Sequence, residues 1–256
     1  MKINYSHNNK RIIILVLSCE NFYHRRISCY NTWFGDILKN FSKYVTPLFF
    51  SFSKINRINK IDILEKYTVY LECTDDYDSN PKKIYSSIEY INNNYDYDYI
   101  FKCDDDTYIN IENLLKFLEN KSFDYCGREA GIIKETSWVS GSPYSGNSPT
   151  NHTGLKNCNA IYAGGGAGYF LSKKSSKIIL KNKEMFEIKG AEDVIVGYIM
   201  NKNNINLVHS DLFCHNNNGY DIINNISLHQ IRDSNIMEKI YHIIKNRSIR
   251  KKYRQK

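Results

Sequence analysis

The sequence predicts an α/β fold, because short β-prone segments alternate with segments of helical period along most of its length. The strongest apolar segment, residues 12–17, is six residues long and lies between polar residues, as expected for a buried strand. A second β-prone segment, residues 97–103, is followed by a helical pattern at residues 111–119. Strands and helices that alternate in this way form a sheet covered by helices.

Four strands and three helices are expected in the first 120 residues. Pro81 favours the first turn of a helix over residues 81–92, and Asn110 can cap a helix over residues 111–119. The apolar residues of both segments recur with helical spacing. The expected strands are residues 11–18, 43–52, 67–73 and 97–103, and the remaining expected helix is residues 22–38.

The second half of the chain begins with a short expected strand at residues 122–126 and continues through an irregular, Gly-, Ser-, Asn- and Pro-rich segment at 127–159. Ser172 can cap a helix that runs to residue 180. A further helix, residues 190–201, carries Glu192 and Asp193 in its first turn. The last expected strand, residues 205–214, ends immediately before His215.

We expect one catalytic domain over residues 1–232 and a basic C-terminal tail or helix over residues 233–256. At 256 residues with 42% apolar content, the chain can bury a sizeable core. Eight Lys and Arg but no acid occur from Lys239 to Lys256, whereas basic and acidic residues balance elsewhere. The net charge of +8 therefore belongs to the tail. This argues against specific nucleic-acid binding and predicts at most a weak contact of the tail with an anionic surface.

The chain has no segment of the ~20 apolar residues that a membrane helix needs, and its polar N-terminus does not resemble a signal peptide. Its seven cysteines are irregularly spaced and contain no CxxC pattern, which gives little support to a zinc site or a disulfide framework. We therefore expect reduced thiols, and either a soluble, cytoplasmic protein or a soluble piece of a longer one.

Three adjacent carboxylates, Asp104, Asp105 and Asp106, stand where the strand at residues 97–103 ends. Adjacent acids repel, so core packing gives no reason to gather them at the end of a strand. A divalent cation gives such a reason, because it takes oxygen ligands and relieves the repulsion. Ligand sites in α/β sheets also lie at the carboxyl ends of strands. We therefore expect a metal site here, with a solvated acidic turn as the alternative.

Four glycines within five residues, Gly164, Gly165, Gly166 and Gly168, mark a second unusual segment. Glycines do not fill a core. They permit unusual backbone angles or let a ligand approach the backbone closely. Their pattern is not GxGxxG after the first strand, which excludes a Rossmann dinucleotide site.

Five separated segments resemble the inverting β1,3-glycosyltransferases of glycosyltransferase family 31, which include β1,3-galactosyltransferases, β1,3-N-acetylglucosaminyltransferases and Fringe-like enzymes. The segments occur in the order found in that family, and the resemblance extends over about residues 12–215. They are RISCYNTW at 26–33, DDY at 75–77 with Lys83, FKCDDDTYIN at 101–110, YAGGGAGYFLS at 162–172 and EDVIVG at 192–197.

Three features depart from the family pattern. The membrane anchor and stem of the eukaryotic members have no counterpart here, and residues 128–159 lack the short aromatic motif that usually precedes the glycine-rich segment. The C-terminal metal histidine of the family has two candidates, His215 and His209. We expect His215, because it follows the apolar residues 212–214 as the family's histidine follows its strand.

The resemblance implies a GT-A fold, with a mixed central sheet flanked by helices, a UDP-sugar donor and Mn²⁺ or Mg²⁺ as cofactor. It implies inverting transfer of a hexose, Gal or GlcNAc, to a hydroxyl of a glycan or glycoprotein acceptor, with β1,3 linkage. The alternative is a catalytically inactive GT-A-like module that binds a sugar or a nucleotide.

The resemblance also assigns the metal ligands. Asp106 is expected to bind the metal, with Asp104 as the second ligand or a ribose contact and His215 as the third ligand. An imidazole ligand favours Mn²⁺ over Mg²⁺. Asp105 is expected to reach hydroxyls of the donor sugar.

Asp193 is the expected general base, with Glu192 as the alternative, although both also suit the first turn of a helix. Arg26 and Lys83 are expected to contact the donor phosphates or to pair with the acids. The backbone from Gly164 to Gly166 is expected to lie close to the donor sugar or the acceptor.

Overall fold

The strand β1, Ile12–Leu17, is an inner strand of a seven-stranded sheet, as its uninterrupted apolar sequence predicts. It pairs in parallel with β2, Val45–Ser51, on one side and with β4, Tyr99–Asp104, on the other. All six of its residues are buried, because a parallel strand covered by helices on both faces has no solvent-exposed side. This computed structural model describes residues 10–52, 63–133, 160–188, 190–215 and 223–254.

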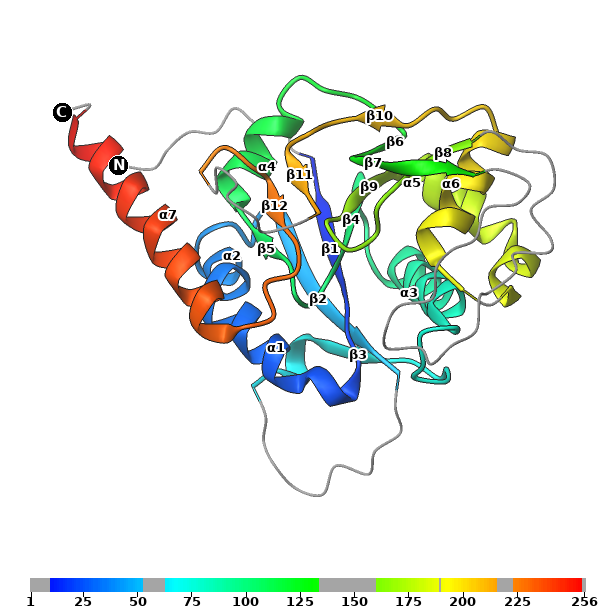
Figure 1. Ribbon diagram of the computed structural model, residues 1–256, viewed down its shortest axis with the longest axis horizontal. Coiled ribbons are helices and arrows are strands. Elements are labelled where there is room, and N and C mark those ends of the chain that lie inside the picture. The colour runs from blue at the N-terminus through cyan, green and yellow to red at the C-terminus, as the bar shows by residue number, and fades with distance from the viewer. Residues whose placement is uncertain (1–9, 53–62, 134–159, 189, 216–222, 255–256) are drawn as a thin grey trace.

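The order of the central sheet is β10-β6-β9-β4-β1-β2-β3 (Figure 1). β3, Thr68–Tyr70, continues the parallel part of the sheet next to β2. β9, Tyr169–Ser172, runs antiparallel to both β4 and β6, Tyr125–Gly127, and β10, Val208–His209, pairs in parallel with β6. The prediction of a mixed α/β sheet flanked by helices is therefore confirmed.

Two smaller sheets stand beside the central one. β5, Tyr108–Ile109, β12, Ser227–Leu228, and β11, Phe213–Cys214, form a three-stranded sheet, so that the segment after the acidic turn meets the C-terminal part of the chain. β7, Glu129–Ile133, and β8, Ala160–Ala163, form an antiparallel pair that packs on α6, Glu192–Lys202.

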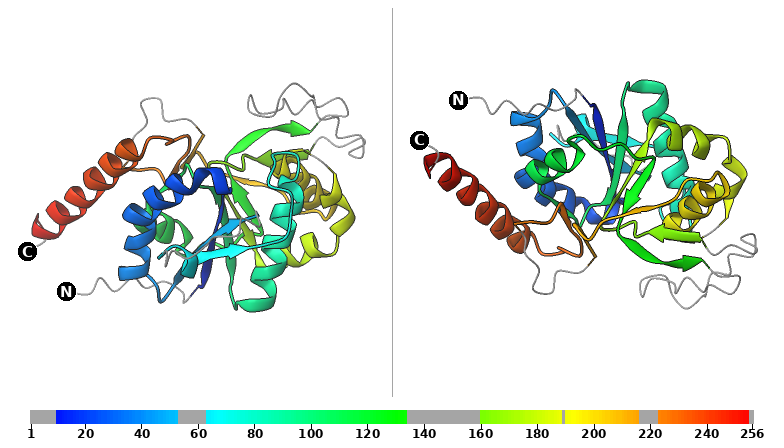
Figure 2. Two further views of the ribbon diagram at one scale, coloured as in Figure 1. Left: turned by 90° about the horizontal axis from the view of Figure 1, so that it is seen from below. Right: turned by 90° about the horizontal axis from the view of Figure 1, so that it is seen from above.

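Helices cover both faces of the central sheet (Figures 1 and 2). Alternate residues of β1 point into two separate cores, with Ile12, Ile14 and Val16 on one side and the residues between them on the other. The first core lies under α1 (Tyr23–Cys29), η2 (Tyr30–Phe34), α2 (Gly35–Asn40), α4 (Ile111–Leu118) and α7 (Ser234–Arg254). The second lies under α3 (Asn80–Asn94), α5 (Lys173–Leu180) and α6. Short 3-10 turns complete the chain at η1 (Glu20–Phe22), η3 (Glu65–Tyr67) and η4 (Lys183–Glu187).

The helix starts agree with the predicted capping signals. The side chain of Asn110 accepts a hydrogen bond from the Asn113 N–H at 3.3 Å, and that of Ser172 accepts one from the Ser175 N–H at 3.2 Å. Pro81 occupies the first turn of α3, where a missing N–H costs nothing. These local signals fix where α3, α4 and α5 begin.

Two expected elements are broken in the structure. The single helix predicted for residues 22–38 is interrupted at Thr32, whose backbone has φ −119° and ψ −114° and whose hydroxyl donates to the Ser28 carbonyl at 2.7 Å. The strand predicted for residues 205–214 is two short strands, β10 and β11, which belong to different sheets because the chain turns between them. Most of the irregular segment predicted at 127–159 lies outside the described residues, although its first part forms β7.

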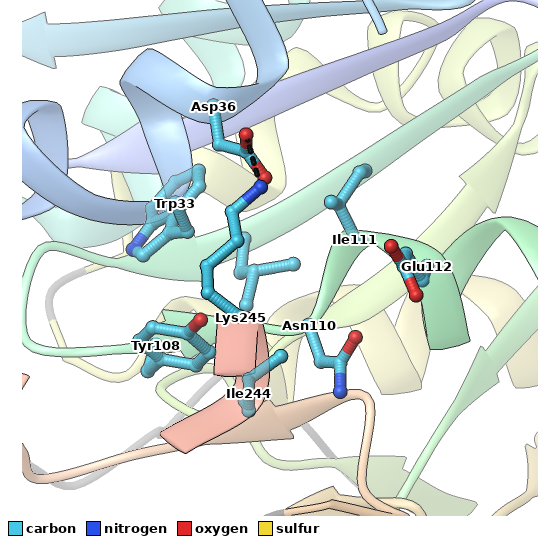
Figure 3. A pocket seen from close by; sticks show the side chains of 9 residues that line it. Trp33, Asp36, Tyr108, Asn110, Ile111, Glu112, Ile244 and Lys245 are labelled. Carbon is cyan, nitrogen blue, oxygen red and sulfur yellow. Dashed lines mark hydrogen bonds and ion pairs between the residues drawn. The ribbon is translucent and has the colours of Figure 1, made fainter. Parts of the chain in front are cut away.

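The first half of α7 is part of the folded body. Met237 and Ile240 are buried in the first core, and the Lys245 ammonium reaches the Asp36 carboxylate at 2.5 Å across a small hollow lined also by Ile244 and Trp33 (Figure 3). The boundary at residue 232 and the anionic-surface contact of the basic end stay predictions. A tail that began at residue 233 would nevertheless include core residues.

Six cysteines lie in the described part of the chain, and each is a free thiol there. Among the helices described, none is both long enough and apolar enough to cross a membrane.

Two isoleucines on α7 provide a matched test of its packing. Ile240 is 4% exposed and Ile243 is 49% exposed. Ile240→Ala should lower the free energy of unfolding in urea by about 2–4 kcal/mol, because it leaves a cavity in the core. Ile243→Ala should change it by less than about 0.5 kcal/mol. Equal effects of the two substitutions would contradict the described docking of α7.

Candidate active site

The three adjacent aspartates lie at the C-terminal edge of the central sheet. Asp104 is the last residue of β4 and pairs in register with Leu17 of β1. The turn that follows is held by the Asp105 N–H, which donates to the Leu17 carbonyl at 3.1 Å, and by the Thr107 N–H, which donates to the Asp104 carbonyl at 3.2 Å. The backbone therefore fixes all three carboxylates at the edge where α/β sheets bind ligands.

Asp106 is surrounded by cationic side chains. Its carboxylate lies 3.1 Å from His229 Nε2, 3.4 Å from Arg232 Nε and 3.6 Å from Arg25 Nη1. Burial by itself would raise the pKa of Asp106, but the hydrogen bond and charge of His229, with the two guanidinium groups, hold the pKa below its ordinary value. Asp106 is therefore ionised at neutral pH.

His229 completes the acidic cluster from a distant part of the chain. It follows β12, and the Ile231 N–H holds the same segment in place by donating to the Asp106 carbonyl at 2.8 Å. Burial would lower the pKa of His229, but the hydrogen bond to Asp106 and the charges of Asp106 and Asp104 raise it. Asp104, Asp106 and His229 offer three ligand atoms that all lie within 4.8 Å of one another.

Neither predicted metal histidine belongs to this cluster. His209 is exposed, accepts a hydrogen bond from the Glu129 N–H at 3.1 Å and lies 3.4 Å from Asp211. His215 lies against Gly164, and its Nε2 is buried with no hydrogen-bond partner among the described residues. Burial and the nearby His229 lower the pKa of His215. The structure thus places His229, rather than His215 or His209, beside Asp104 and Asp106.

The glycine-rich segment lies directly against the polar side chains of the site. A Cβ on Gly164 would collide with His215, one on Gly165 with Glu192, and one on Gly166 with His229. The Gly166 carbonyl accepts a hydrogen bond from the Thr107 hydroxyl at 2.8 Å, so the segment is tied to the acidic turn. A side chain at any of these positions would force its neighbour to shift, so glycine permits this close packing. The expected approach of the donor sugar or the acceptor to this backbone stays a prediction.

Lys102 is a buried lysine between the acidic turn and α6. Its ammonium lies 2.8 Å from Asp104 Oδ1, 2.5 Å from Glu192 Oε1 and 3.2 Å from the Gly165 carbonyl oxygen. Burial alone would lower the pKa of Lys102, but the charges of Asp104 and Glu192 hold it above its ordinary value. Lys102 belongs to the FKCDDDTYIN segment at 101–110, from which no role was predicted for it.

The two acids at the start of α6 have different environments. Glu192 is buried and ion-paired with Lys102, whereas Asp193 accepts hydrogen bonds from the Gly165 N–H and from its neighbour Val194 N–H, each at 2.9 Å. Burial and the adjacent Glu192 charge raise the pKa of Asp193 to about 7, against the opposing effect of these hydrogen bonds and of Lys102. A carboxyl group that titrates near neutral pH suits a general base, so the environment favours Asp193 over Glu192.

Asp105 shares Arg25 with Asp106 but otherwise has a different partner, Ser18. It is buried, accepts a hydrogen bond from the Ser18 hydroxyl at 2.7 Å and lies 3.3 Å from Arg25 Nη1. Burial raises the pKa of Asp105 to about 7, although Ser18 and Arg25 oppose the shift. Asp105 thus links the acidic turn to Ser18 and to Arg25 of α1. Its expected contact with hydroxyls of the donor sugar stays a prediction.

The predicted phosphate contacts Arg26 and Lys83 pair with acids outside the triple-aspartate turn. Arg26 is fully buried and lies 3.4 Å from Glu20. Lys83 lies 3.0 Å from Asp75, a member of the motif that the resemblance had singled out. Arg25, the neighbour of Arg26, is the residue of this pair that reaches Asp105 and Asp106.

The raised pKa of Asp193 predicts a pH dependence of stability. In the folded state Asp193 keeps its proton up to about pH 7, whereas an unfolded carboxyl loses it near pH 4. At Asp193 the folded state therefore binds more protons between these values, and the contribution of this group to stability falls as pH rises from 4 to 7. Asp193→Asn should reduce this fall by an amount on the order of a few kcal/mol in urea unfolding.

The exposed residue Asp211 provides the control for this measurement, since its side chain is 78% exposed. Asp211→Asn should leave the pH dependence of unfolding unchanged within about 0.5 kcal/mol. An identical pH dependence for wild type and Asp193→Asn would show that Asp193 has no raised pKa.

A family model described as Galactosyltransferase matches residues 24–211. No curated protein matches the chain. One similar solved structure is a glycosyltransferase involved in the glycosylation of the major capsid of PBCV-1, with 12% identity, TM-score 0.49 and coverage of 90% of this chain and 99% of that chain. Another is the inositol-1-phosphate CTP transferase from T. maritima, with 10% identity, TM-score 0.46 and coverage of 90% and 96%. Because the family model extends from α1 to the turn after β10, the chain belongs to the galactosyltransferase family.

Proposed function

We propose that this protein is a metal-dependent, inverting hexosyltransferase that moves Gal or GlcNAc from a UDP-sugar to a hydroxyl of a glycan or glycoprotein acceptor, with β1,3 linkage. Membership of the galactosyltransferase family supports glycosyl transfer. One observation supports metal dependence and base catalysis. A cluster of groups able to hold a metal and a separate carboxyl group with a pKa of about 7 both lie next to the same glycine-rich turn.

The proposed metal site consists of Asp104, Asp106 and His229. Two carboxylates and one imidazole fit a divalent transition metal, and the nitrogen ligand favours Mn²⁺ over Mg²⁺. When bound, the cation supplies stabilisation of the charge on the leaving diphosphate. Arg25 and Arg232, the cationic side chains around Asp106, are proposed to balance further phosphate charge.

Asp193 is the proposed general base. Its two hydrogen bonds orient the carboxylate, and its pKa near 7 lets it take a proton from an acceptor hydroxyl at neutral pH. Glu192 is less suited to this role, because its carboxylate is ion-paired with Lys102. Asp193 therefore accepts the proton in this proposal, whereas Glu192 pairs with the buried Lys102.

A catalytically inactive sugar- or nucleotide-binding module is the second candidate. The presence of Asp104, Asp106 and Asp193 in one site counts against it, because a binding module has no use for a base. Release of UDP from a UDP-sugar, with or without an added acceptor, separates the two functions.

Metal dependence is tested with UDP itself. In calorimetric titrations, UDP should bind wild type in Mn²⁺ and bind at least about 100-fold more weakly when Mn²⁺ is omitted, since loss of an outer-shell partner alone costs ~10–100-fold. Asp106→Asn should remove the Mn²⁺-dependent part of binding. Asp211→Asn, at an exposed acid outside the cluster, should bind like wild type.

The identity of the third ligand is tested in the same titrations. His229→Ala should weaken Mn²⁺-dependent binding far more than His215→Ala, because only His229 lies beside the two aspartates. The reverse order would return His215 to the metal site. Wild type that binds no UDP with or without Mn²⁺ would refute the donor assignment.

The role of Asp193 is tested by turnover. Asp193→Asn should lower turnover by ~10²–10⁴-fold while UDP affinity in Mn²⁺ is retained, since a general base contributes about that much. Wild-type turnover should rise about tenfold per pH unit below pH 7 and level off above it, because the base acts only when ionised. Near wild-type turnover in the variant would exclude Asp193 as the base.

A further inference from the structure

Lys102 occupies an unusual place in the sheet. It is 2% exposed and lies on β4 between the apolar residues Phe101 and Cys103. Successive side chains of a strand alternate between faces, so Lys102 and Asp104 point to the same side. A buried ammonium is costly unless its charge is paired and its three N–H groups are satisfied. The sequence places this costly residue two positions before the acidic turn.

The three acceptors of Lys102 belong to three different parts of the site. Asp104 is a proposed metal ligand, Glu192 starts α6, and the carbonyl of Gly165 belongs to the glycine-rich turn. Together these acceptors use every proton of the ammonium. Lys102 therefore joins the end of β4, the glycine-rich turn and α6 at one atom.

Two of the three contacts of Lys102 lead on to a proposed functional group. Asp104 uses Oδ1 for Lys102, which leaves Oδ2 facing His229 Nε2 at 3.8 Å. The Gly165 residue whose carbonyl bonds Lys102 donates its own N–H to Asp193 Oδ2 at 2.9 Å. On one side Lys102 restrains a metal-binding carboxylate, and on the other it restrains the residue that holds the proposed base.

We propose that Lys102 is a positioning residue that couples the metal site to the general base by holding Asp104 and the Gly165 peptide at a fixed separation. This inference rests on the proposed function, since it concerns the same metal and the same base. The competing explanation is that Lys102 only neutralises the buried charge of Glu192.

A double variant separates the two explanations. Lys102→Met alone leaves Glu192 buried without a counterion and can fail to fold. Lys102→Met/Glu192→Gln removes one charge of each sign, and Asp104, whose side chain is 35% exposed, can be solvated in the absence of Lys102. The double variant should therefore melt near the wild-type temperature.

Two quantities are measured. Binding of Mn²⁺ alone is monitored through the electron paramagnetic resonance signal of free Mn²⁺. Turnover is measured as release of UDP from UDP-galactose and UDP-N-acetylglucosamine. In the double variant the Mn²⁺ dissociation constant should rise by ~10–100-fold, the usual effect of losing a group that orients a ligand. At saturating Mn²⁺, kcat should still be lowered at least about tenfold, because the base side is displaced as well.

The matched control is Lys174→Met. Lys174 also forms a lysine–aspartate pair, at 2.6 Å from Asp124, but its side chain is 65% exposed and lies outside the site. This variant should keep the wild-type Mn²⁺ affinity and kcat.

Three results would overturn the inference. Wild-type Mn²⁺ affinity and kcat in the double variant would reduce Lys102 to a counterion for Glu192. Weaker Mn²⁺ binding with full kcat at saturation would limit Lys102 to the metal side. Wild type that binds neither Mn²⁺ nor UDP would overturn the proposed function together with the inference, whereas the first two results leave the proposed function intact.

Discussion

Repulsion among the three carboxylates at the end of β4 is the constraint on which the arrangement of the site depends. The structure relieves it with cations from three directions. Arg25 comes from α1, Lys102 from β4 itself, and His229 and Arg232 from the segment before α7. Because these basic side chains come from α1, from β4 and from the segment before α7, the packing of these three parts around the sheet edge determines the charge balance of the turn.

The glycine-rich turn gives the polar side chains of the site room to lie close together. His215, Glu192 and His229 approach three consecutive glycines so closely that a Cβ there would displace them. The turn can then share its carbonyl and N–H groups between Lys102 and Asp193. A single short segment thus separates the proposed metal ligands from the proposed base and bonds to both.

Local sequence signals predicted the fold well wherever the structure depends on local interactions. The apolar sequence of β1, the caps at Asn110 and Ser172, and the acids at the end of β4 all occur where predicted. His229 could not be found in this way. Its strand, β12, has two residues and gives no periodic pattern, and its contact with Asp106 depends on β5 pairing with β12. The only sequence signal for His229 is that it follows a short segment with apolar residues at 226 and 228. The choice of His215 rested on a similar signal, the apolar residues 212–214 before it.

The late position of the C-terminal segment in the sequence determines when the site is completed during synthesis. Arg232 contacts Asp106 across 126 positions of sequence, and the residues that hold this segment in place, such as Met237 and Ile240, come later still. During synthesis the aspartates, Arg25 and Lys102 are all made long before His229 and Arg232, so Asp106 lacks two of its three basic neighbours until the C-terminal segment is made. Packing of this segment is therefore the event that completes the surroundings of Asp106.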